Sequence, residues 1–353
     1  MIVVMKTDAT DEMIVGIERA IRGQGLRPQV IRGTNRTVVA AIGEKRGPVK
    51  ERLERMDGVA DVVPILAPYK LACREVHPEP TTVRVGTLQV GGRMFGMIAG
   101  PCSIESEEQM VETAKAVKKA GATAIRGGAF KPRTSPYAFR GLHERGLELL
   151  DVARQETGLP VVTELLAEHD AILVAKYADV IQIGARNMQN YRLLEVAGQI
   201  GKPILLKRGP AATLEELLLA AEYILNTGNP DVILCERGIR TFETHTRFTL
   251  PLASVEYLHQ KTHLPVIVDP SHATGIASLV PSSAMAAIAA GADGLIVEVH
   301  PEPAKALCDG AQSLSFPQFR ELTERCRRIA DVVGKQWAGS PEETGKASGE
   351  SGE

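Results

Sequence analysis

The sequence is poor in the features that mark secreted and membrane-spanning proteins. Its five cysteines are too few and too scattered for a disulfide framework in 353 residues, so we expect reduced thiols. No apolar run approaches the roughly 18 residues that a membrane span needs. Lys6 and Asp8 interrupt the opening segment before a signal-peptide core could form. We therefore expect a cytoplasmic protein without a membrane partner.

An excess of basic residues is also missing. Lys and Arg number 41 against 43 Asp and Glu, which gives a formal net charge of −2 and no global positive field to hold a polyanion. The single tryptophan, Trp337, cannot form a stacking platform for bases. These absences argue against a nucleic-acid partner. With 353 residues, of which 44% are hydrophobic, the chain is long and apolar enough to form one or two domains with a large core.

Residues 1–66 follow the order strand, helix, strand, strand, helix, strand. The apolar segments MIVVMK, RPQVIRG, TVVAAIG and VADVVPI are the expected strands. Residues 10–22 and 49–56 have the periodicity of helices. This order predicts a small ferredoxin-like (βαββαβ) domain.

From residue 95 onward, eight β-rich apolar segments alternate with amphipathic helical segments. The expected strands are FGMIAGP, ATAIRGG, PVVTE, VIQIGA, PILLKR, VILCERG, PVIVDPS and GLIVEV. Near-continuous apolar strands fit a parallel sheet covered by helices, and eight such units over residues 95–333 predict a (β/α)8 TIM barrel. A doubly wound open sheet is the alternative, which the lack of a GxGxxG or P-loop after the first strand disfavours.

Two segments flank the expected barrel. Residues 67–94 begin with prolines and mixed charge, and we assign them to a linker and an extension at the bottom of the barrel. Residues 334–353 are rich in Gly, Ser and Glu, and we assign them to a disordered tail.

Polar residues follow every expected strand of the barrel. In chain order they are Cys102, Arg126, Glu164, Arg186, Lys207 with Arg208, Glu236 with Arg237, Asp269 with His272, and Glu298 with His300. The reacting groups of a barrel enzyme lie at the C-terminal ends of its strands. One charged residue in such a place can be purely structural, but a series through all eight strands indicates a functional site.

Four residues form a candidate metal site. Cys102, His272, Glu298 and Asp309 offer a thiolate, an imidazole and two carboxylates, which suit one divalent metal such as Mn²⁺, Fe²⁺, Co²⁺ or Zn²⁺. Their spacing matches no local zinc-finger pattern, so the site depends on the barrel bringing distant residues together. A buried structural cysteine and a loop histidine are the alternative.

Cys308 lies next to Asp309 in the chain and allows two interpretations. It is either a loop cysteine without a chemical role or a thiol that forms a disulfide with Cys102 when the metal is absent. The other three cysteines fall in the expected linker, a strand and a helix, where we predict no chemistry.

A cationic set shares the same strand ends. It consists of Arg126, Lys131, Arg133, Arg186, Lys207, Arg208 and Arg237. Arginine forks and lysine ammonium groups that converge on one barrel mouth suit phosphorylated substrates, and two such substrates would explain their number. The segment KPRTSP, with two cations, a hydroxyl and two prolines, predicts a rigid loop that holds a phosphate. Surface ion pairs are the alternative for each residue alone.

A series of motifs runs through nearly the whole expected barrel. In chain order they are AGPCSIES, RGGAFKPRTSPYAFRG, QIGARNMQN, PILLKRG, ERGIRTFE, VIVDPSHATG and EVHPEPAKALCDGAQSL. Together they closely resemble 3-deoxy-7-phosphoheptulonate (DAHP) synthase, in the type I beta form with an N-terminal ferredoxin-like domain. The resemblance implies a transferase that condenses phosphoenolpyruvate with erythrose 4-phosphate and releases phosphate, in the first step of the shikimate pathway.

The resemblance also implies roles for individual residues. Cys102, His272, Glu298 and Asp309 would be the metal ligands. Substrate binding would fall to Arg126, Lys131, Pro132, Arg133, Thr134, Ala185, Arg186, Lys207 and Arg237, with the loop from Lys131 to Thr134 taking the aldose phosphate. Lys131, Lys207 and Glu164 are the candidate catalytic residues, and Lys207 and Glu164 would position or deprotonate the attacking water.

A related enzyme, 3-deoxy-octulosonate 8-phosphate synthase, is the alternative, because it shares the barrel and the phosphoenolpyruvate site but uses arabinose 5-phosphate. It carries a KANRSS-type loop where this chain has KPRTSP, which favours the heptulonate enzyme. Similar family members are inhibited by tyrosine or phenylalanine, so the N-terminal domain is expected to be regulatory. The alternative is a purely structural assembly module. We expect a homotetramer.

Overall fold

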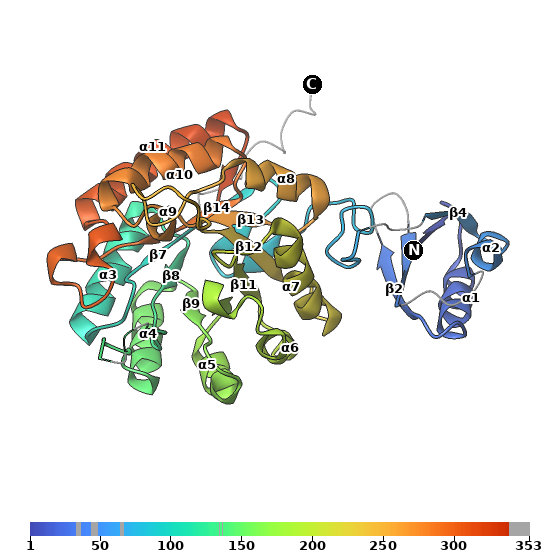
Figure 1. The fold of residues 1–353 in the computed structure, drawn as a ribbon, viewed down its shortest axis with the longest axis horizontal. Coiled ribbons are helices and arrows are strands. Elements are labelled where there is room, and N and C mark those ends of the chain that lie inside the picture. The colour runs from blue at the N-terminus through green and yellow to red at the C-terminus, as the bar shows by residue number, and fades with distance from the viewer. Residues whose placement is uncertain (33–36, 44–48, 64–66, 134, 136, 339–353) are drawn as a thin grey trace, which may run out of the picture.

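The structure is a computed structural model that describes residues 1–32, 37–43, 49–63, 67–133, 135 and 137–338. A small N-terminal domain lies beside a larger barrel, and the chain runs from one into the other (Figure 1). No helix in the described ranges is long and apolar enough to cross a membrane.

The N-terminal domain is the ferredoxin-like fold that the sequence predicts. Its antiparallel sheet has the order β2-β3-β1-β4 and is formed by β1 (Ile2–Met5), β2 (Arg27–Arg32), β3 (Thr37–Ile42) and β4 (Val59–Val63). The helices α1 (Asp11–Arg22) and α2 (Val49–Glu54) cover one face. Helix α1 begins where the Thr10 side chain accepts a hydrogen bond from the Met13 backbone N–H. Its apolar stripe of Ile14, Ile17 and Ile21 is buried against the sheet.

The larger domain is the predicted (β/α)8 barrel. Its eight parallel strands are β7 (Met94–Gly100), β8 (Ala124–Arg126), β9 (Val161–Glu164), β10 (Val180–Ile183), β11 (Ile204–Lys207), β12 (Val232–Glu236), β13 (Val266–Val268) and β14 (Gly294–Glu298). The last strand pairs with the first, from Gly294 opposite Gly96 to Glu298 opposite Gly100. This closure excludes the open-sheet alternative, because an open sheet would leave two free edges.

Helices follow each strand and cover the outside of the barrel (Figure 1). They are α3 (Glu107–Ala120), α4 (Glu144–Thr157), α5 (Ala171–Tyr177), α6 (Tyr191–Gln199), α7 (Leu214–Asn226), α8 (Ala253–Lys261), the short α9 (Pro270–Thr274) with α10 (Val280–Ala289), and α11 (Phe316–Val332). Their starts are fixed by local sequence. Thr213 and Glu216, for example, form a capping box at α7, in which each side chain accepts from the other residue's backbone N–H.

A hairpin fills the N-terminal end of the barrel. Its strands are β5 (Val83–Val85) and β6 (Leu88–Val90), and its buried residues Val83, Leu88 and Val90 share one apolar cluster with the inward side chains of the barrel strands. Gly96 makes room for it, since a Cβ there would lie 2.6 Å from the Val90 side chain. The apolar end of the barrel is thereby closed, and the polar strand ends face the opposite side.

The expected linker is docked on the barrel. The backbone N–H groups of Leu71 and Ala72 donate to the Glu222 carboxylate on α7, at 2.8 and 2.9 Å. His263 binds the same segment, because its Nε2 lies 2.9 Å from the Leu71 carbonyl oxygen. Residues 67–82 are therefore held by specific contacts.

The structure corrects the predicted start of the tail at residue 334. Gln336–Trp337 form a short strand, β15, that pairs with β7. The Trp337 ring is 6% exposed, stacks at a tilt on Phe95 and donates its indole N–H to the Gly121 carbonyl at 2.9 Å. The prediction failed here because one large apolar residue in a polar segment gives no periodic signal. The remainder of the predicted tail, residues 339–353, lies outside the described residues.

Candidate active site

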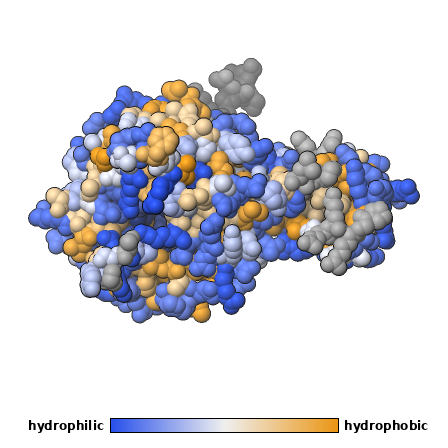
Figure 2. Space-filling view, viewed as in Figure 1, coloured by the Kyte–Doolittle hydropathy of each residue, from blue (hydrophilic) through white to orange (hydrophobic). Residues whose placement is uncertain are grey.

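A cavity of about 650 Å³ opens at the C-terminal ends of the barrel strands. Hydrophilic side chains gather around a hollow on this part of the surface (Figure 2). Most of the predicted site residues line the cavity, namely Lys131, Pro132, Arg133, Glu164, Ala185, Arg186, Lys207, Arg237, His272 and Asp309. Thr134 lies outside the described residues.

The cavity is strongly cationic. Its lining includes Lys131, Arg133, Arg186, Lys207, Arg237, Arg240 and Arg247, against the two carboxylates of Glu164 and Asp309. Among the described side chains, only Arg237 has a fully buried nitrogen or oxygen atom, Nη1, without a hydrogen-bond partner. Burial lowers the pKa of Arg237, whose guanidinium also lies 4.1 Å above the Phe248 ring. A buried, unpaired donor of this kind is costly unless an anion binds it.

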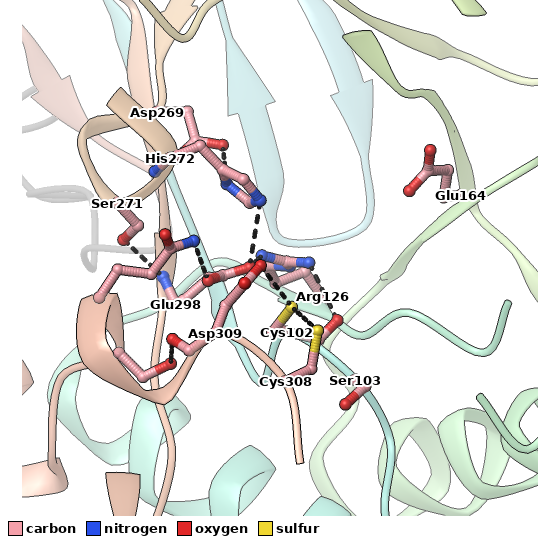
Figure 3. A network of polar contacts seen from close by, with 12 residues as sticks. Cys102, Ser103, Arg126, Glu164, Asp269, Ser271, His272, Glu298, Cys308 and Asp309 are labelled. Atoms are coloured by element: carbon pink, nitrogen blue, oxygen red, sulfur yellow. Dashed lines mark hydrogen bonds and ion pairs between the residues drawn. The ribbon is translucent and has the colours of Figure 1, made fainter. Parts of the chain in front are cut away.

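The four predicted metal donors come together at the floor of the cavity. His272, Glu298 and Asp309 place three donor atoms within 4.8 Å of one another, and so do Cys102, Cys308 and Asp309. Asp309 belongs to both groups. Figure 3 shows these side chains converging from α9, β14 and two loops. Among the described residues, these are the two groups that could hold a metal ion.

Asp269 orients two of the cavity residues. Its Oδ2 accepts a hydrogen bond from His272 Nδ1 at 2.7 Å and pairs with Lys207 Nζ at 2.5 Å. Burial opposes ionisation of Asp269, but His272 and Lys207 hold its pKa well below the usual range. Burial also lowers the pKa of His272. With Nδ1 engaged, Nε2 is the atom left for a metal.

Glu298 is fixed by a buried ion pair. Arg126 Nη1 lies 2.6 Å from Glu298 Oε1, and Gln312 donates to Oε2 at 2.6 Å. Burial would raise the pKa of Glu298, but His272 and Arg126 lower it to about 2. Arg126 lies beneath the cavity and is not among its lining residues. Its other nitrogen, Nη2, donates to the Cys102 carbonyl at 3.3 Å. Its predicted contact with phosphoenolpyruvate stays a prediction.

The two thiols near the floor are in contact. Cys102 Sγ lies 3.2 Å from Cys308 Sγ, and both cysteines are free. Lys131 Nζ donates to Cys102 Sγ at 3.1 Å. Arg133 Nη1 donates to Cys308 Sγ at 2.5 Å. The hydrogen bond from Cys102, with help from Lys131 and Arg133, lowers the pKa of Cys308 to about 7, whereas that bond and burial raise the pKa of Cys102.

The loop after β14 carries Cys308 and Asp309 and is tied to the loop after β7. Glu105 accepts a hydrogen bond from the Leu307 backbone N–H at 2.9 Å, and its other oxygen lies 3.4 Å from His300 Nε2. Asp309 itself has φ = 51°, a left-handed conformation that is uncommon outside glycine. Non-glycine residues in such conformations cluster at functional sites.

Two residues from the predicted series lie elsewhere. Arg208 and Glu236 form a buried pair at 2.7 Å and do not line the cavity, so their role is structural. Glu164 lines the cavity but lies apart from the metal donors (Figure 3). Gln182 donates to its carboxylate at 3.3 Å.

Arg240 and Arg247 were missed from the sequence. Both line the cavity from the segment between β12 and α8, which folds back so that Ile239 and Thr249 pair. Arg247 donates to Gln312 Oε1 at 3.1 Å and lies 3.8 Å from Asp309 Oδ1. The irregular segment has no periodicity to place its arginines. The only usable signal was two further cations shortly after a strand end.

Comparison with known proteins identifies the family. Residues 79–333 match the DAHP synthetase I family. The chain belongs to this family. Residues 1–67 match the DAHP synthase ferredoxin-like domain, which accompanies the family's barrel here as the resemblance implied.

Members of the DAHP synthetase I family and related aldolases are similar over most of the chain. A phospho-2-dehydro-3-deoxyheptonate aldolase of Thermotoga maritima is 51% identical over 334 residues, which cover 95% of this chain and 99% of the relative. A 2-dehydro-3-deoxyphosphooctonate aldolase of Syntrophotalea carbinolica is 32% identical over 72% of this chain and 98% of its own length.

Solved structures agree with this assignment. A crystal structure of the Thermotoga maritima DAHP synthase matches with a TM-score of 0.76 and 49% identity, covering 95% of this chain and 98% of the other. A truncated form of that synthase matches with a TM-score of 0.72 and 50% identity, covering 76% of this chain and 99% of the other.

Proposed function

We propose that this enzyme condenses phosphoenolpyruvate with D-erythrose 4-phosphate and water to give 3-deoxy-D-arabino-heptulosonate 7-phosphate and phosphate, the first step of the shikimate pathway. The family and the heptulonate relative at 51% identity support this transferase activity. The observation in the molecule that carries it is the buried, unpaired Arg237 Nη1 in a cationic cavity beside a metal donor set. Such a cavity suits two phosphorylated substrates.

The donors fit one divalent transition metal, and we propose Cys102, His272, Glu298 and Asp309 as its ligands. Thiolate, imidazole and carboxylate donors suit Mn²⁺, Fe²⁺, Co²⁺ or Zn²⁺, and the Asp309 carboxylate links them, since it lies within 4.8 Å of the donors of His272 and Glu298 and also within 4.8 Å of the Cys102 thiol. The Asp269 hydrogen bond fixes the ring orientation that a ligand histidine needs. When bound, the metal supplies a Lewis acid for the aldehyde carbonyl of the sugar.

The cations of the cavity supply the rest of the chemistry. We assign Arg186, Lys207 and Arg237 to phosphoenolpyruvate, and the loop of Lys131, Pro132 and Arg133 to erythrose 4-phosphate. They are in place before substrates arrive, because Lys207 is held by Asp269 and Arg186 donates to the Pro132 carbonyl at 3.3 Å. Preorganised cations stabilise the phosphate charge without rearranging during the reaction.

The bond-forming step joins C3 of phosphoenolpyruvate to the aldehyde carbon of the sugar. Positive charge then develops at C2 of phosphoenolpyruvate and is met by water, which gives a tetrahedral hemiketal phosphate that loses phosphate by C–O cleavage. Lys207 and Glu164 both line the cavity and are our candidates for acting on this water, Lys207 by orienting it and Glu164 by accepting its proton. Burial disfavours the charged form of Lys131, but the nearby Cys102 and Cys308 raise its pKa. As an ammonium ion it can donate a hydrogen bond to the sugar.

The N-terminal domain contributes none of the cavity residues. We propose that it is regulatory, with tyrosine or phenylalanine as the feedback inhibitor, and that the enzyme is a homotetramer. Inhibition by either amino acid in a steady-state assay, and the mass of the particle in solution, test these two parts separately.

The decisive experiment measures phosphate release with erythrose 4-phosphate and with arabinose 5-phosphate side by side, each with and without EDTA. We expect turnover with erythrose 4-phosphate only, and loss of turnover in EDTA with recovery on adding Mn²⁺. Preference for arabinose 5-phosphate would instead assign the octulosonate reaction named by the relatives at about 32% identity.

A further inference from the structure

Cys308 is a buried thiol at the floor of the cavity that the proposed reaction does not use. It is 3% exposed, and its sulfur lies 3.2 Å from Cys102 Sγ. Cys102 Sγ in turn lies 3.3 Å from Asp309 Oδ2. The donor atoms of these three residues all fall within 4.8 Å of one another, as close as those of His272, Glu298 and Asp309.

We propose that Cys308 is an additional metal ligand, so that the site binds a thiophilic divalent cation such as Zn²⁺ or Cd²⁺ through two thiolates and Asp309. The proposal rests on the metal site described under Proposed function and adds one ligand to it. Each thiol releases its proton to solvent as it binds, so the two sulfurs add two negative charges to the site. Soft thiolate pairs favour Zn²⁺ and Cd²⁺ over Mn²⁺, which prefers oxygen. Cys308 thus determines which metal the enzyme retains.

The geometry needs little adjustment to accept such an ion. Two thiolates on one tetrahedral Zn²⁺, each about 2.3 Å from it, lie about 3.8 Å apart. The present sulfur separation of 3.2 Å has to open by only about half an ångström. Asp309 belongs to both donor groups, so an ion on its carboxylate reaches Cys308 on one side and His272 on the other.

Two cations offset the charge that a second thiolate brings. Lys131 Nζ donates to Cys102 Sγ at 3.1 Å, and Arg133 Nη1 donates to Cys308 Sγ at 2.5 Å. Hydrogen bonds from charged donors stabilise bound thiolates and orient them. Each sulfur therefore has its own cationic partner, an arrangement that an unused loop cysteine does not require.

The test is a titration of the metal-free, full-length enzyme with Cd²⁺, which gives an ultraviolet thiolate-to-metal absorption for each bound thiolate. We expect Cys308→Ser to halve this absorption per bound Cd²⁺ and to weaken Cd²⁺ affinity by about tenfold or more. Affinity for Mn²⁺, measured by calorimetry, should change by less than about threefold. Cys326→Ala is the matched control, because Cys326 is buried in α11 and should leave both values unchanged.

The outcomes separate this proposal from the metal site on which it rests. If Cys308→Ser keeps the wild-type Cd²⁺ absorption and affinity, Cys308 is not a ligand, and the four-ligand site still stands. If Cys102→Ser also binds both metals like the wild type, the whole metal site is wrong. X-ray absorption of the Zn²⁺-loaded wild type needs no variant, and two sulfur neighbours support the proposal whereas one overturns it.

Discussion

At the scale of single residues, Asp269 connects the two kinds of chemistry in the cavity. One carboxylate oxygen contacts both His272, a proposed metal ligand, and Lys207, a proposed phosphate ligand. The sequence placed Asp269 at a strand end but gave no reason to prefer it to Glu236, which has a structural role. Which polar residue faces the cavity depends on side-chain direction at the barrel rim, and the sequence pattern does not contain that information.

We predict that Asp269→Asn weakens metal binding by about 10- to 100-fold, since an amide neither fixes the same imidazole tautomer nor balances the charge of Lys207. Calorimetric titration with Mn²⁺ measures this effect. Glu156→Gln on α4 is the control, because Glu156 is exposed and pairs with Lys115 at the surface. Equal Mn²⁺ affinity in the wild type and Asp269→Asn would contradict the positioning role.

The contact between Cys102 and Cys308 predicts oxidation of the metal-free enzyme. Hydrogen peroxide should convert the two thiols to one disulfide, with loss of two hydrogen atoms and formation of two waters, because the sulfurs are already 3.2 Å apart. Peptide mapping by mass spectrometry without reduction should show the linked peptides, and saturating Mn²⁺ should suppress them. Two free thiols after treatment would refute the prediction.

At the scale of elements, the regular parts of the fold were predictable and the loops were not. Continuous apolar strands and capped amphipathic helices are local patterns, so the eight strands and the ferredoxin-like domain could be read from the chain. The segment with Arg240 and Arg247, the position of Arg126 beneath the cavity, and strand β15 depend on long-range contacts. The periodicity of apolar residues in the sequence does not predict such long-range contacts.

The bond between Glu105 and the Leu307 backbone makes the loop after β14 a rigid part of the site. We predict that Glu105→Ala weakens Mn²⁺ binding by about tenfold through loss of order at Asp309. Hydrogen exchange at the Leu307 amide should accelerate in parallel. Glu302→Ala on the same loop is the control, since Glu302 is exposed and pairs with Lys305. Unchanged hydrogen exchange and unchanged Mn²⁺ affinity in Glu105→Ala would show that Glu105 does not hold this loop in place.

The docked linker predicts a pH dependence of stability. Burial, together with the nearby His77, lowers the pKa of His263 from 6.5 to about 4. Its neutral ring is therefore favoured in the folded state, with Nδ1 2.7 Å from Thr81 Oγ1 and Nε2 2.9 Å from the Leu71 carbonyl. Because the folded-state pKa is depressed, this contribution is complete above about pH 6.5 and is lost as the pH falls toward 4.

Between pH 7 and pH 5, His263 should account for about 2 kcal/mol of the loss in unfolding free energy. Urea unfolding at the two pH values measures it. His263→Gln should lose less stability over this interval than the wild type, whereas His169→Gln, with its exposed ring, should behave as the wild type does. An identical pH dependence in the wild type and His263→Gln would contradict the assignment.

At the scale of the whole molecule, all the proposed chemistry belongs to the barrel. The N-terminal domain instead packs through the second face of its sheet, where Ile2 and Val38 share an apolar cluster with Tyr69 and Leu71 of the docked segment.

Removal of residues 1–66 separates regulation from assembly. We predict that the truncated enzyme condenses phosphoenolpyruvate with erythrose 4-phosphate at a rate within about threefold of the full chain, because no cavity residue is lost. Inhibition by tyrosine or phenylalanine should disappear. Loss of solubility or of the native oligomer, measured by light scattering, would show instead that the domain is an assembly module.

The hairpin of β5 and β6 determines where substrates enter the enzyme and where products leave it. Since it fills the N-terminal end of the barrel with packed apolar side chains, both substrates and both products must exchange through the one cationic mouth at the other end. The phosphate released by one turnover leaves past the arginines that must capture the next phosphoenolpyruvate. Release of phosphate and binding of the next phosphoenolpyruvate therefore compete at the same opening. The cations that attract the substrate also slow the release of the product.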